Sequence, residues 1–477
     1  MKLTSYIFAA CLFLASGINA QPPDTLWTKS VGHGYPNKLD IIRTLDNGYA
    51  IGTATWPEGR RIYNMLFTRT DSLGNILWQR FYNRSDSDNF RYETFAEAIR
   101  KMSDGGFVLA GLEEGGALVV RTDSMGEPLW MKNLSRDEYG MRWAYGCEVG
   151  DDGNIVVVGE DRAIKLDDQR QGEVIWSRSY DIGGGEDILH IVKAAEGGYI
   201  LIGRTTTIGE GAADMYVVRI DETGDILWRE SYGTQFNEVC AGGAQNDDGG
   251  WCLVGSQRYG MSDSLHAMAV RITADGEEIW RKVYNQYRRG NLLRAVVQTP
   301  DSGFALAGYD GTASKFLLIR TDKDGEALWR GRYVSHRGSE GACISIMLME
   351  DGGYTLGGKN RDGVCLIRTK PDTTHTAPDT NSVEPDDRYP ASFAINSIYP
   401  NPFNSTTIIT FGLSKQASTR LGIFGLDGRL IEEMNLGRLK AGKHAVTWDG
   451  SSYPAGLYLL RLDSPENQAV RKMILVK

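Results

Sequence analysis

The sequence predicts an all-β protein built from one repeated unit of four short antiparallel strands. Two recurring turns support this prediction. In the first, a glycine stands directly before an aromatic residue; in the second, a glycine stands four residues before a tryptophan. Successive tryptophans of the second series lie 46 to 52 residues apart, from Trp78 to Trp329. A period near fifty residues with four strands per repeat is typical of a β-propeller.

Residues 104–130 show most of the unit. Asp104-Gly105-Gly106 has the composition of a tight turn, since glycine reaches positive φ without cost and Asp bonds its own backbone. Residues 107–111 alternate as a short strand, and residues 117–121 form a second apolar run. A turn at 123–126 then leads into a strand at Leu129-Trp130, and residues 96–102 supply a strand before the unit.

The tryptophans are expected to dock each sheet onto a neighbour, because a buried Trp hides roughly 150–250 Å² of surface. The predicted docking residues are Trp27, Trp78, Trp130, Trp176, Trp228, Trp280 and Trp329. The strand before each Gly-x-x-x-Trp turn ends on a cation. We expect this cation and the Asp of the glycine-aromatic turn to satisfy each other and the local backbone.

The two ends of the array suggest how it closes. The seventh copy, residues 352–368, has no Gly-x-x-x-Trp after it, whereas Leu26-Trp27 stands near the N-terminus with no repeat before it. We therefore expect the N-terminal segment to supply the fourth strand of the seventh copy, which removes the free edges of an open array. The predicted fold is a seven-bladed β-propeller over residues 21–370.

Residues 1–20 have the charged start, apolar run and small-residue end of a secretory signal. No other stretch approaches membrane-spanning length. The five remaining cysteines are expected to be buried small hydrophobes, although a Cys240–Cys252 disulfide remains possible. The net charge of −9 argues against nucleic acid and anionic membrane as partners. We expect a monomer.

Residues 371–393 are polar, acidic and proline-bearing, as in a flexible linker. The remaining residues, 394–477, show five strand-like runs separated by turns, which predicts a small β-sandwich.

Five motifs in this C-terminal part occur in a specific order: 399–404 (YPNPFN), 423–429 (IFGLDGR), 448–450 (WDG), 455–458 (AGLY) and 472–477 (KMILVK). In this order and position they resemble the type A sorting domain of type IX secretion. The resemblance implies an immunoglobulin-like sandwich, engagement of the type IX secretion machinery, and export through the periplasm to the outer surface of a Gram-negative bacterium of the Bacteroidota or a related phylum. Such domains are commonly cleaved after export. Gly425 departs from the family, which usually has a polar residue there.

The repeat Arg-Thr-Asp-x-x-Gly-x-x-x-Trp also resembles pyrroloquinoline-quinone propellers, in which the tryptophan docks neighbouring blades. Those dehydrogenases have eight blades and an adjacent cysteine pair near the cofactor, and this chain has no such pair. We predict no cofactor. The six histidines are scattered without ligand spacing, so no metal site is predicted. No catalytic residue can be assigned, because no nucleophile motif is present.

Acidic and aromatic residues recur in the loops that precede the first strand or follow the second strand of each blade. The acids are Asp40, Glu97, Asp187, Glu238 and Glu340, with Arg294 in the sixth blade; the aromatics are Trp56, Tyr63, Tyr92, Trp143, Tyr145, Phe236, Tyr259 and Tyr287. Such a set could bind a sugar or a peptide. Alternatively, the acids bond loop amides and the aromatics fill the blade tops. The candidate ligand-binding residues are Asp40, Glu97, Trp143, Tyr145, Asp187 and Glu238.

Three functions follow from these observations. The first is a secreted or cell-surface binding module for a glycan, a peptide or an envelope protein. The second is an extracellular polysaccharide-active enzyme whose catalytic pair lies among the loop acids. The third is a rigid scaffold that presents surfaces to other envelope proteins.

Overall fold

The computed structural model describes residues 21–31, 39–55, 63–83, 93–258, 265–284, 290–311, 315–334, 341–360, 363–373, 393–399, 401, 403–413, 415–425, 428–440, 442–465 and 467–476. The expected secretory signal and residues 374–392 of the expected linker lie outside them. The chain forms two compact units, residues 1–376 and 377–477. In the described residues both units are made of β-strands, apart from the single turn of helix α1 (Arg136–Tyr139).

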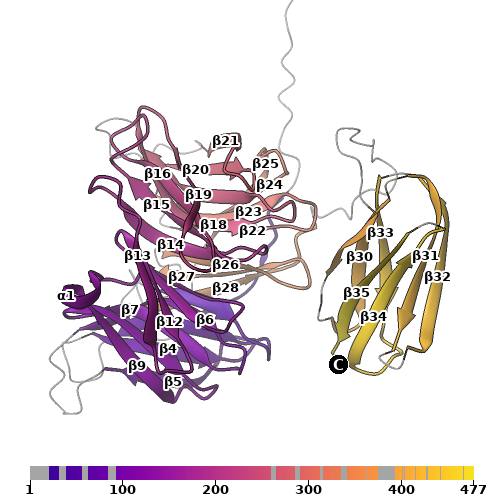
Figure 1. The fold of residues 1–477 in the computed structure, drawn as a ribbon, viewed down its shortest axis with the longest axis horizontal. Helices are drawn as coiled ribbons and strands as arrows, with labels where there is room; N and C mark the ends of the chain where they lie inside the picture. The colour runs from indigo at the N-terminus through magenta and orange to yellow at the C-terminus, as the bar shows by residue number, and fades with distance from the viewer. Residues whose placement is uncertain are drawn as a thin grey trace, which may run out of the picture. The chain divides into compact units, whose positions relative to one another are not determined.

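The described part of the first unit contains seven four-stranded antiparallel sheets, here numbered along the chain (Figure 1). Sheet 1 consists of β2 (Asp40–Arg43), β3 (Tyr49–Thr55), β4 (Asn64–Thr70) and β5 (Ile76–Tyr82). Sheet 2 consists of β6 (Thr94–Lys101), β7 (Phe107–Glu113), β8 (Gly116–Thr122) and β9 (Pro128–Ser135). Sheet 3 consists of β10 (Gly146–Val149), β11 (Ile155–Gly159), β12 (Arg162–Asp167) and β13 (Glu173–Ser179). Sheet 4 consists of β14 (Asp187–Lys193), β15 (Tyr199–Thr205), β16 (Asp214–Ile220) and β17 (Ile226–Tyr232).

The next two sheets have the same order. Sheet 5 consists of β18 (Asn237–Gln245), β19 (Trp251–Arg258), β20 (Leu265–Ile272) and β21 (Glu278–Tyr284). Sheet 6 consists of β22 (Asn291–Gln298), β23 (Phe304–Asp310), β24 (Lys315–Thr321) and β25 (Ala327–Tyr333). The predicted unit of four antiparallel strands is therefore confirmed, because consecutive strands pair in each of these sheets.

Sheet 7 joins the two ends of the first unit. It consists of β26 (Gly341–Leu348), β27 (Tyr354–Asn360), β28 (Gly363–Thr369) and, as its fourth strand, β1 (Thr25–Ser30). Trp27 lies opposite Arg368 and Ser30 opposite Cys365. The N-terminal strand thus completes the last sheet, as the sequence predicts.

The first strand of each sheet contacts the first strand of the next. These contacts run through β2, β6, β10, β14, β18, β22 and β26, and β26 in turn contacts β2. The middle strands are buried on both faces: all seven residues of β3, β4, β8 and β16 are buried. This explains why these strands are nearly continuous apolar runs, since neighbouring sheets cover both of their faces.

The apolar clusters extend from one sheet to the next. Phe67 of sheet 1 packs with Phe107 of sheet 2, and Ile164 of sheet 3 packs in one cluster with Val119 of sheet 2. A four-stranded sheet therefore buries its faces only through its neighbours.

All five described cysteines are buried free thiols, so the Cys240–Cys252 disulfide is not formed.

The second unit contains two sheets around one apolar core that includes Phe403, Trp448 and Tyr458. One sheet consists of β29 (Ala394–Tyr399), β30 (Thr406–Leu413) and β33 (Gly442–Asp449). The other consists of β32 (Leu430–Leu439), β31 (Ala417–Phe424), β34 (Gly456–Asp463) and β35 (Gln468–Leu475). In the described parts of both units, no helix has the length and apolar character needed to cross a membrane.

Candidate functional site

Each sheet of the first unit has two ends. At the turn end lie the glycine turns that join the first strand to the second and, in sheets 1 to 6, the third strand to the fourth. At the opposite end, here called the loop end, the first strand begins and the second strand finishes. The turn end carries the tryptophan contacts between sheets, and the loop end carries the sequence-predicted ligand residues.

At the turn end, tryptophans contact the following sheet. Trp78 of β5 packs on Gly126, the turn glycine between β8 and β9: a Cβ added there would lie 2.6 Å from the indole. Equivalent pairs are Trp130 with Gly172, Trp176 with Gly224, Trp228 with Gly276, and Trp280 with Gly325. Trp27 of β1 meets the Tyr49 ring of sheet 1, with 6.4 Å between ring centroids.

A tyrosine four residues after the tryptophan makes a second contact, which the sequence analysis missed. Its hydroxyl donates to the carbonyl oxygen of the same turn glycine. The pairs are Tyr82 with Gly126 (2.7 Å), Tyr180 with Gly224 (2.9 Å), Tyr232 with Gly276 (2.5 Å) and Tyr284 with Gly325 (3.0 Å). The Trp-x-x-x-Tyr spacing is visible in the sequence and would have identified these residues.

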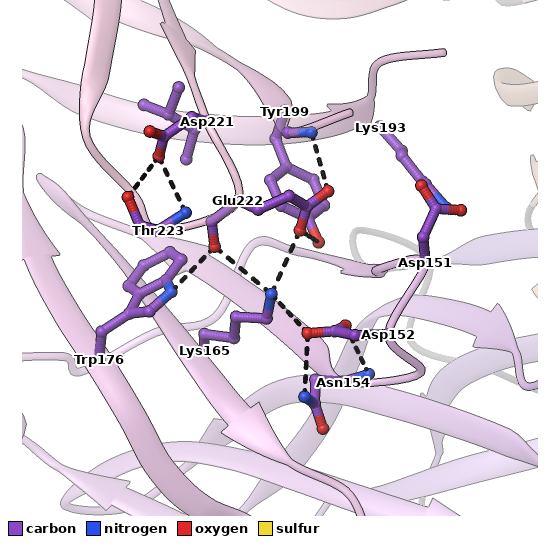
Figure 2. A network of polar contacts seen from close by, with 12 residues as sticks. Asp151, Asp152, Asn154, Lys165, Trp176, Lys193, Tyr199, Asp221, Glu222 and Thr223 are labelled. Carbon is purple, nitrogen blue, oxygen red and sulfur yellow. Dashed lines mark hydrogen bonds and ion pairs between the residues drawn. The ribbon is translucent and has the colours of Figure 1, made fainter. Parts of the chain in front are cut away.

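The cation near the end of the third strand binds the turns around it, as Lys165 shows (Figure 2). Lys165 Nζ lies 2.8 Å from Asp152 of its own sheet and 3.2 Å from Glu222 of sheet 4. Trp176 Nε1 donates to the Glu222 carbonyl at 3.2 Å. Burial acts to raise the pKa of Asp152, but hydrogen bonds from Lys165 and Asn154 outweigh it and the pKa lies below its usual value. The network therefore joins two sheets.

The junction of sheets 6 and 7 contains a residue that the sequence places in the linker. Asp372 is buried, accepts hydrogen bonds from Trp329 Nε1 (3.3 Å) and the Tyr354 hydroxyl (3.0 Å), and lies 3.7 Å from Arg320. At the junction of sheets 2 and 3, Asp168 binds Trp130 and Arg121 in the same way. The first unit thus includes Asp372.

At the loop end, the five predicted acids do not occupy equivalent positions. Counted back from the residue before the second strand, Asp40 stands eight residues away, Glu97 nine, Asp187 eleven and Glu238 twelve. Glu340, like the aromatics Trp56, Tyr92, Tyr259 and Tyr287, lies outside the described residues. The acids therefore do not form one layer.

Asp40 lies on β2, one of the first strands that contact one another from sheet to sheet; we call this set of first strands the wall. Its carboxylate accepts hydrogen bonds from Arg100 Nη1 (2.7 Å) and from the backbone N–H of Ile99 (3.1 Å). Arg100 also donates to Glu148 at 2.6 Å, so three sheets are tied by one guanidinium. The pKa of His190 is lowered to about 4, first by burial and then by the nearby Arg100, while Asp40 acts in the opposite direction.

Glu238 supports a loop. It is fully buried and accepts from the N–H and hydroxyl of Thr234 and from Gln257. Glu186, adjacent to the predicted Asp187, has the equivalent role: it accepts from Ile182 N–H (3.1 Å) and from Thr205 (2.8 Å). Both acids stand twelve residues before their turn glycine, and that spacing would have identified Glu186.

Trp143 and Tyr145 pack together, and Asp187 and Glu97 act electrostatically on Tyr145. The Trp143 and Tyr145 rings are 5.7 Å apart, and the Arg142 guanidinium lies over the Trp143 ring. Burial raises the pKa of Tyr145 to about 12, with further contributions from Asp187, Glu97 and Glu160. Asp187 accepts two hydrogen bonds from the exposed Arg204. We name Glu97, Trp143, Tyr145 and Asp187 the loop-end cluster.

A β-bulge in the first strand changes which side chain stands opposite the second strand at the loop end. The register of the first strand shifts at Ala96/Ala98 in sheet 2 and at Leu293/Ala295 in sheet 6, which leaves Glu97 and Arg294 as the unpaired residues. Bulges re-aim side chains. Residues at the same nine-residue spacing in the other sheets include Tyr145, Leu189, Ala241 and Ile344.

Comparisons with known proteins identify the second unit. Residues 397–477 match the family model described as the secretion system C-terminal sorting domain. The chain thus carries a type IX sorting domain, which implies interaction with the type IX machinery and marks a secreted or cell-surface protein of the Bacteroidetes. No curated protein matches the chain.

Solved structures similar to the chain include PorZ, a surface component of the type IX secretion system of Porphyromonas gingivalis. The identity is 12%, the TM-score 0.44, and the match covers 94% of this chain and 61% of PorZ. The extracellular domain of a putative one-component system from B. thetaiotaomicron matches at 12% identity and a TM-score of 0.43, over 94% of this chain and 57% of that one. The chain thus spans less than two thirds of the length of these two proteins.

A third structure, described as YCF48 bound to D1 peptide, has 12% identity and a TM-score of 0.42, over 72% of this chain and 99% of that one. At 12% sequence identity, the functions of these proteins cannot be assigned to this chain.

Proposed function

We propose that the protein is a secreted or cell-surface binding protein whose first unit is a seven-bladed β-propeller. In this proposal the propeller spans residues 21–370 with Asp372 attached, residues 371–393 contain the linker, and residues 394–477 form an immunoglobulin-like sorting domain. The closed series of contacts between first strands supports the propeller. The pairing of β1 with β28 supports its closure.

The observation that carries the binding role is the loop-end cluster. It combines two half-buried aromatic side chains with carboxylates from the adjoining sheets. Aromatic faces stack on sugar rings, and carboxylates accept hydrogen bonds from hydroxyl and amide groups. Asp40 and Glu238 act instead as internal supports, since their hydrogen bonds are made to Arg100 and to the Thr234 loop.

The same contacts weaken the case for a polysaccharide-active enzyme. Glycoside hydrolysis by a carboxylate pair requires both carboxylates to reach the scissile bond. Glu238 is fully buried, and Asp187 is held by Arg204. No contact among the described residues favours catalysis over binding, so we propose recognition without turnover.

A glycan and peptide array with product analysis tests this function. The chain from Gln21 to Lys477 is applied as wild type, as Trp143→Ala and as Tyr145→Ala. Tyr139→Ala is the control, since Tyr139 lies nearby on α1 but outside the cluster. We expect hits that vanish in the cluster variants and persist in the control. Cleavage of a bound ligand, or binding that is unchanged in both cluster variants, would contradict the proposal.

A further inference from the structure

At the turn end, the last residue of a first strand can bind the turn of the neighbouring sheet. In sheet 4 this residue is Lys193, whose Nζ lies 2.6 Å from Asp151 of sheet 3 (Figure 2). In sheet 1 it is Arg43, which lies 3.3 Å from Glu350 of sheet 7. Both acids stand two residues after the first strand of their own sheet. These ion pairs therefore join neighbouring sheets at equivalent positions.

Two glutamines make the same connection. Gln245 Oε1, at the end of the first strand of sheet 5, accepts from the backbone N–H of Ala195 in sheet 4 at 2.7 Å. Gln298 Oε1 of sheet 6 accepts from the backbone N–H of Asp247 in sheet 5 at 2.9 Å. The position thus brings a side chain to the neighbouring turn whether that side chain is a cation or an amide.

Lys101 ends the first strand of sheet 2 but has no such partner. The residue two places after the first strand of sheet 1 is Leu45, which offers no side-chain acceptor. No hydrogen bond or ion pair joins Lys101 to any other residue that the structure describes. Lys101 is half-buried, and burial lowers its pKa. Its ammonium group has therefore lost hydration without gaining an acceptor.

The leucine that replaces the acceptor is highly exposed. Leu45 is 82% exposed, the highest value among the exposed large apolar residues that the structure describes. Two more aliphatic residues lie in turns at this end: Leu73 of sheet 1 is 60% exposed and Met125 of sheet 2 is 57% exposed. Each directly precedes the glycine of the turn between the third and fourth strands. The equivalent residues of sheets 4, 5 and 6 are polar: Thr223, Asp275 and Asp324.

The turns that carry these residues adjoin one another. The Arg69 guanidinium donates to Asp46 and to the carbonyl oxygen of Thr70, so the turns that carry Leu45 and Leu73 lie side by side. The turn between the third and fourth strands of sheet 2 packs on the fourth strand of sheet 1. We call the exposed aliphatic residues of these turns, together with the unpaired lysine, the turn-end patch: Leu45, Leu73, Lys101 and Met125.

We propose that the turn-end patch binds an acidic, aliphatic segment of a partner protein. A carboxylate of that segment accepts from Lys101, as Asp151 accepts from Lys193, and a neighbouring aliphatic side chain packs on Leu45. A sugar matches the patch less well, because the patch has no aromatic ring to stack on. An anionic membrane also matches less well, because the patch has one cation and the chain has a net charge of −9. This surface is separate from the loop-end cluster.

An array of short peptides tests the proposal. The peptides contain Leu-Glu-Leu or Leu-Asp-Leu, and each has a matched peptide in which Gln or Asn replaces the acid. The chain from Gln21 to Lys477 is applied as wild type, Lys101→Gln, Leu45→Asp and Lys193→Gln, and fluorescence polarisation gives the Kd of each hit. The last variant is the control, since it removes the same charge at the equivalent position of sheet 4. We expect the wild type to bind acidic peptides only, roughly 10-fold more weakly in Lys101→Gln and with no change in Lys193→Gln.

Leu45→Asp should abolish binding, and it also tests the geometry without any peptide. Its carboxylate should pair with Lys101 as Asp151 pairs with Lys193. Lys101→Gln should therefore lower the melting temperature more in the Leu45→Asp background than in the wild type. Equal effects in the two backgrounds would show that the two positions do not face each other, and would overturn the proposal.

The remaining outcomes separate this proposal from the proposed function. An array without hits, binding that does not require the acid, or Kd values unchanged by Lys101→Gln would overturn it. Hits that are lost in Trp143→Ala would belong to the loop-end cluster, which overturns the turn-end patch and supports the proposed function. Concentration-dependent dimerisation that Leu45→Asp abolishes would assign the patch to a second copy of this chain instead. Thermal unfolding of each variant checks that the protein is folded, which the exposure of Leu45 leads us to expect.

Discussion

The hydroxyl of Tyr333 donates a 2.9 Å hydrogen bond to the carbonyl oxygen of Pro23, 310 residues away in the sequence. In four other sheets the equivalent tyrosine binds the turn glycine of the following sheet. Sheet 7 has no such turn, because its third and fourth strands come from opposite ends of the first unit. Pro23 replaces the glycine carbonyl, and Asp372 replaces the turn residue that accepts a hydrogen bond from the docking tryptophan. Lys370 N–H joins the two halves by bonding Asp24 O at 2.8 Å. Residues from the N-terminal segment and from the segment after β28 therefore together make the contacts that a single glycine turn makes in the other sheets.

The contacts of Asp372 predict a sharp C-terminal boundary for the first unit. A chain truncated after Thr373 should unfold at the same temperature as one that keeps the linker. Truncation after Lys370 removes Asp372, which leaves Arg320, Trp329 and Tyr354 without its carboxylate. We expect a loss of about 2–4 kcal/mol, the range for breaking a buried charged network. Thermal and denaturant unfolding measure this, and equal stability of the two truncations would contradict the role of Asp372.

The contact between Trp78 and Gly126 predicts that replacing Gly126 lowers stability more than replacing a glycine with open space around it. Gly126 has φ +80° and a Cβ there would lie 2.6 Å from the indole, whereas Gly115 has φ +92° and nothing within 4 Å of its Cβ position. Both Ala substitutions incur backbone strain, but only Gly126→Ala also displaces Trp78. We expect Gly126→Ala to cost about 1–3 kcal/mol more than Gly115→Ala, as overpacking does. Equal costs in urea unfolding would show that the indole contact adds nothing.

The contacts of Asp40 and Asp187 predict opposite consequences for two acids that look alike in the sequence. Asp40→Asn weakens the link to Arg100 in a partly buried wall, so we expect a loss of about 1–3 kcal/mol. Asp187→Asn breaks an ion pair between a half-buried aspartate and the exposed Arg204 and should cost no more than about 1 kcal/mol. If Asp187 binds ligand, Asp187→Asn weakens array binding while leaving the melting temperature unchanged. A large loss of stability in Asp187→Asn would assign it a structural role.

Asp214 predicts a pH dependence of stability. It is 1% exposed, and burial raises its pKa; a hydrogen bond from Gly211 N–H opposes the shift, while Glu238 and Glu210 add to it. A raised folded pKa means that protonation stabilises the fold. This contribution is complete below the ordinary value of 3.8 and is lost as the pH rises through the folded pKa.

Asp214→Asn should therefore melt above the wild type at pH 7, because it removes a buried charge. The difference should shrink as the pH falls through the folded pKa of Asp214, where the wild-type carboxyl gains its proton. Asp275→Asn, at an exposed turn position, serves as the control and should show no such trend. A melting-temperature difference independent of pH would refute the assignment to Asp214.

The sorting domain predicts a defect in export without a defect in folding. Deleting residues 394–477 removes the second unit, whereas the apolar clusters of the first unit stay intact. We expect the truncated chain to accumulate in the periplasm of a host with type IX secretion, with the circular dichroism of a folded β-protein. Fractionation with immunoblotting measures this, and normal export of the truncated chain would contradict the prediction.

Local patterns in the sequence determined much of the architecture. The all-β class and the four-stranded antiparallel unit follow from glycine turns and from strands with period-two or continuous apolar patterns. These are short-range signals, because a turn and its flanking strands lie within about fifteen residues, as hairpins do. The sorting domain was likewise readable, since its motifs are contiguous in the chain.

Only the tertiary structure decided what each polar residue does. Asp187 and Glu186 are adjacent, yet Glu186 is buried beneath a loop and Asp187 meets Arg204. Asp372 has a linker-like sequence but binds Trp329 and Tyr354. A bulge shifts side-chain direction by one residue, and the partners come from strands that are tens to hundreds of residues away. Sequence spacing fixes where a strand begins and ends; the partners of its side chains depend on which sheets pack beside it.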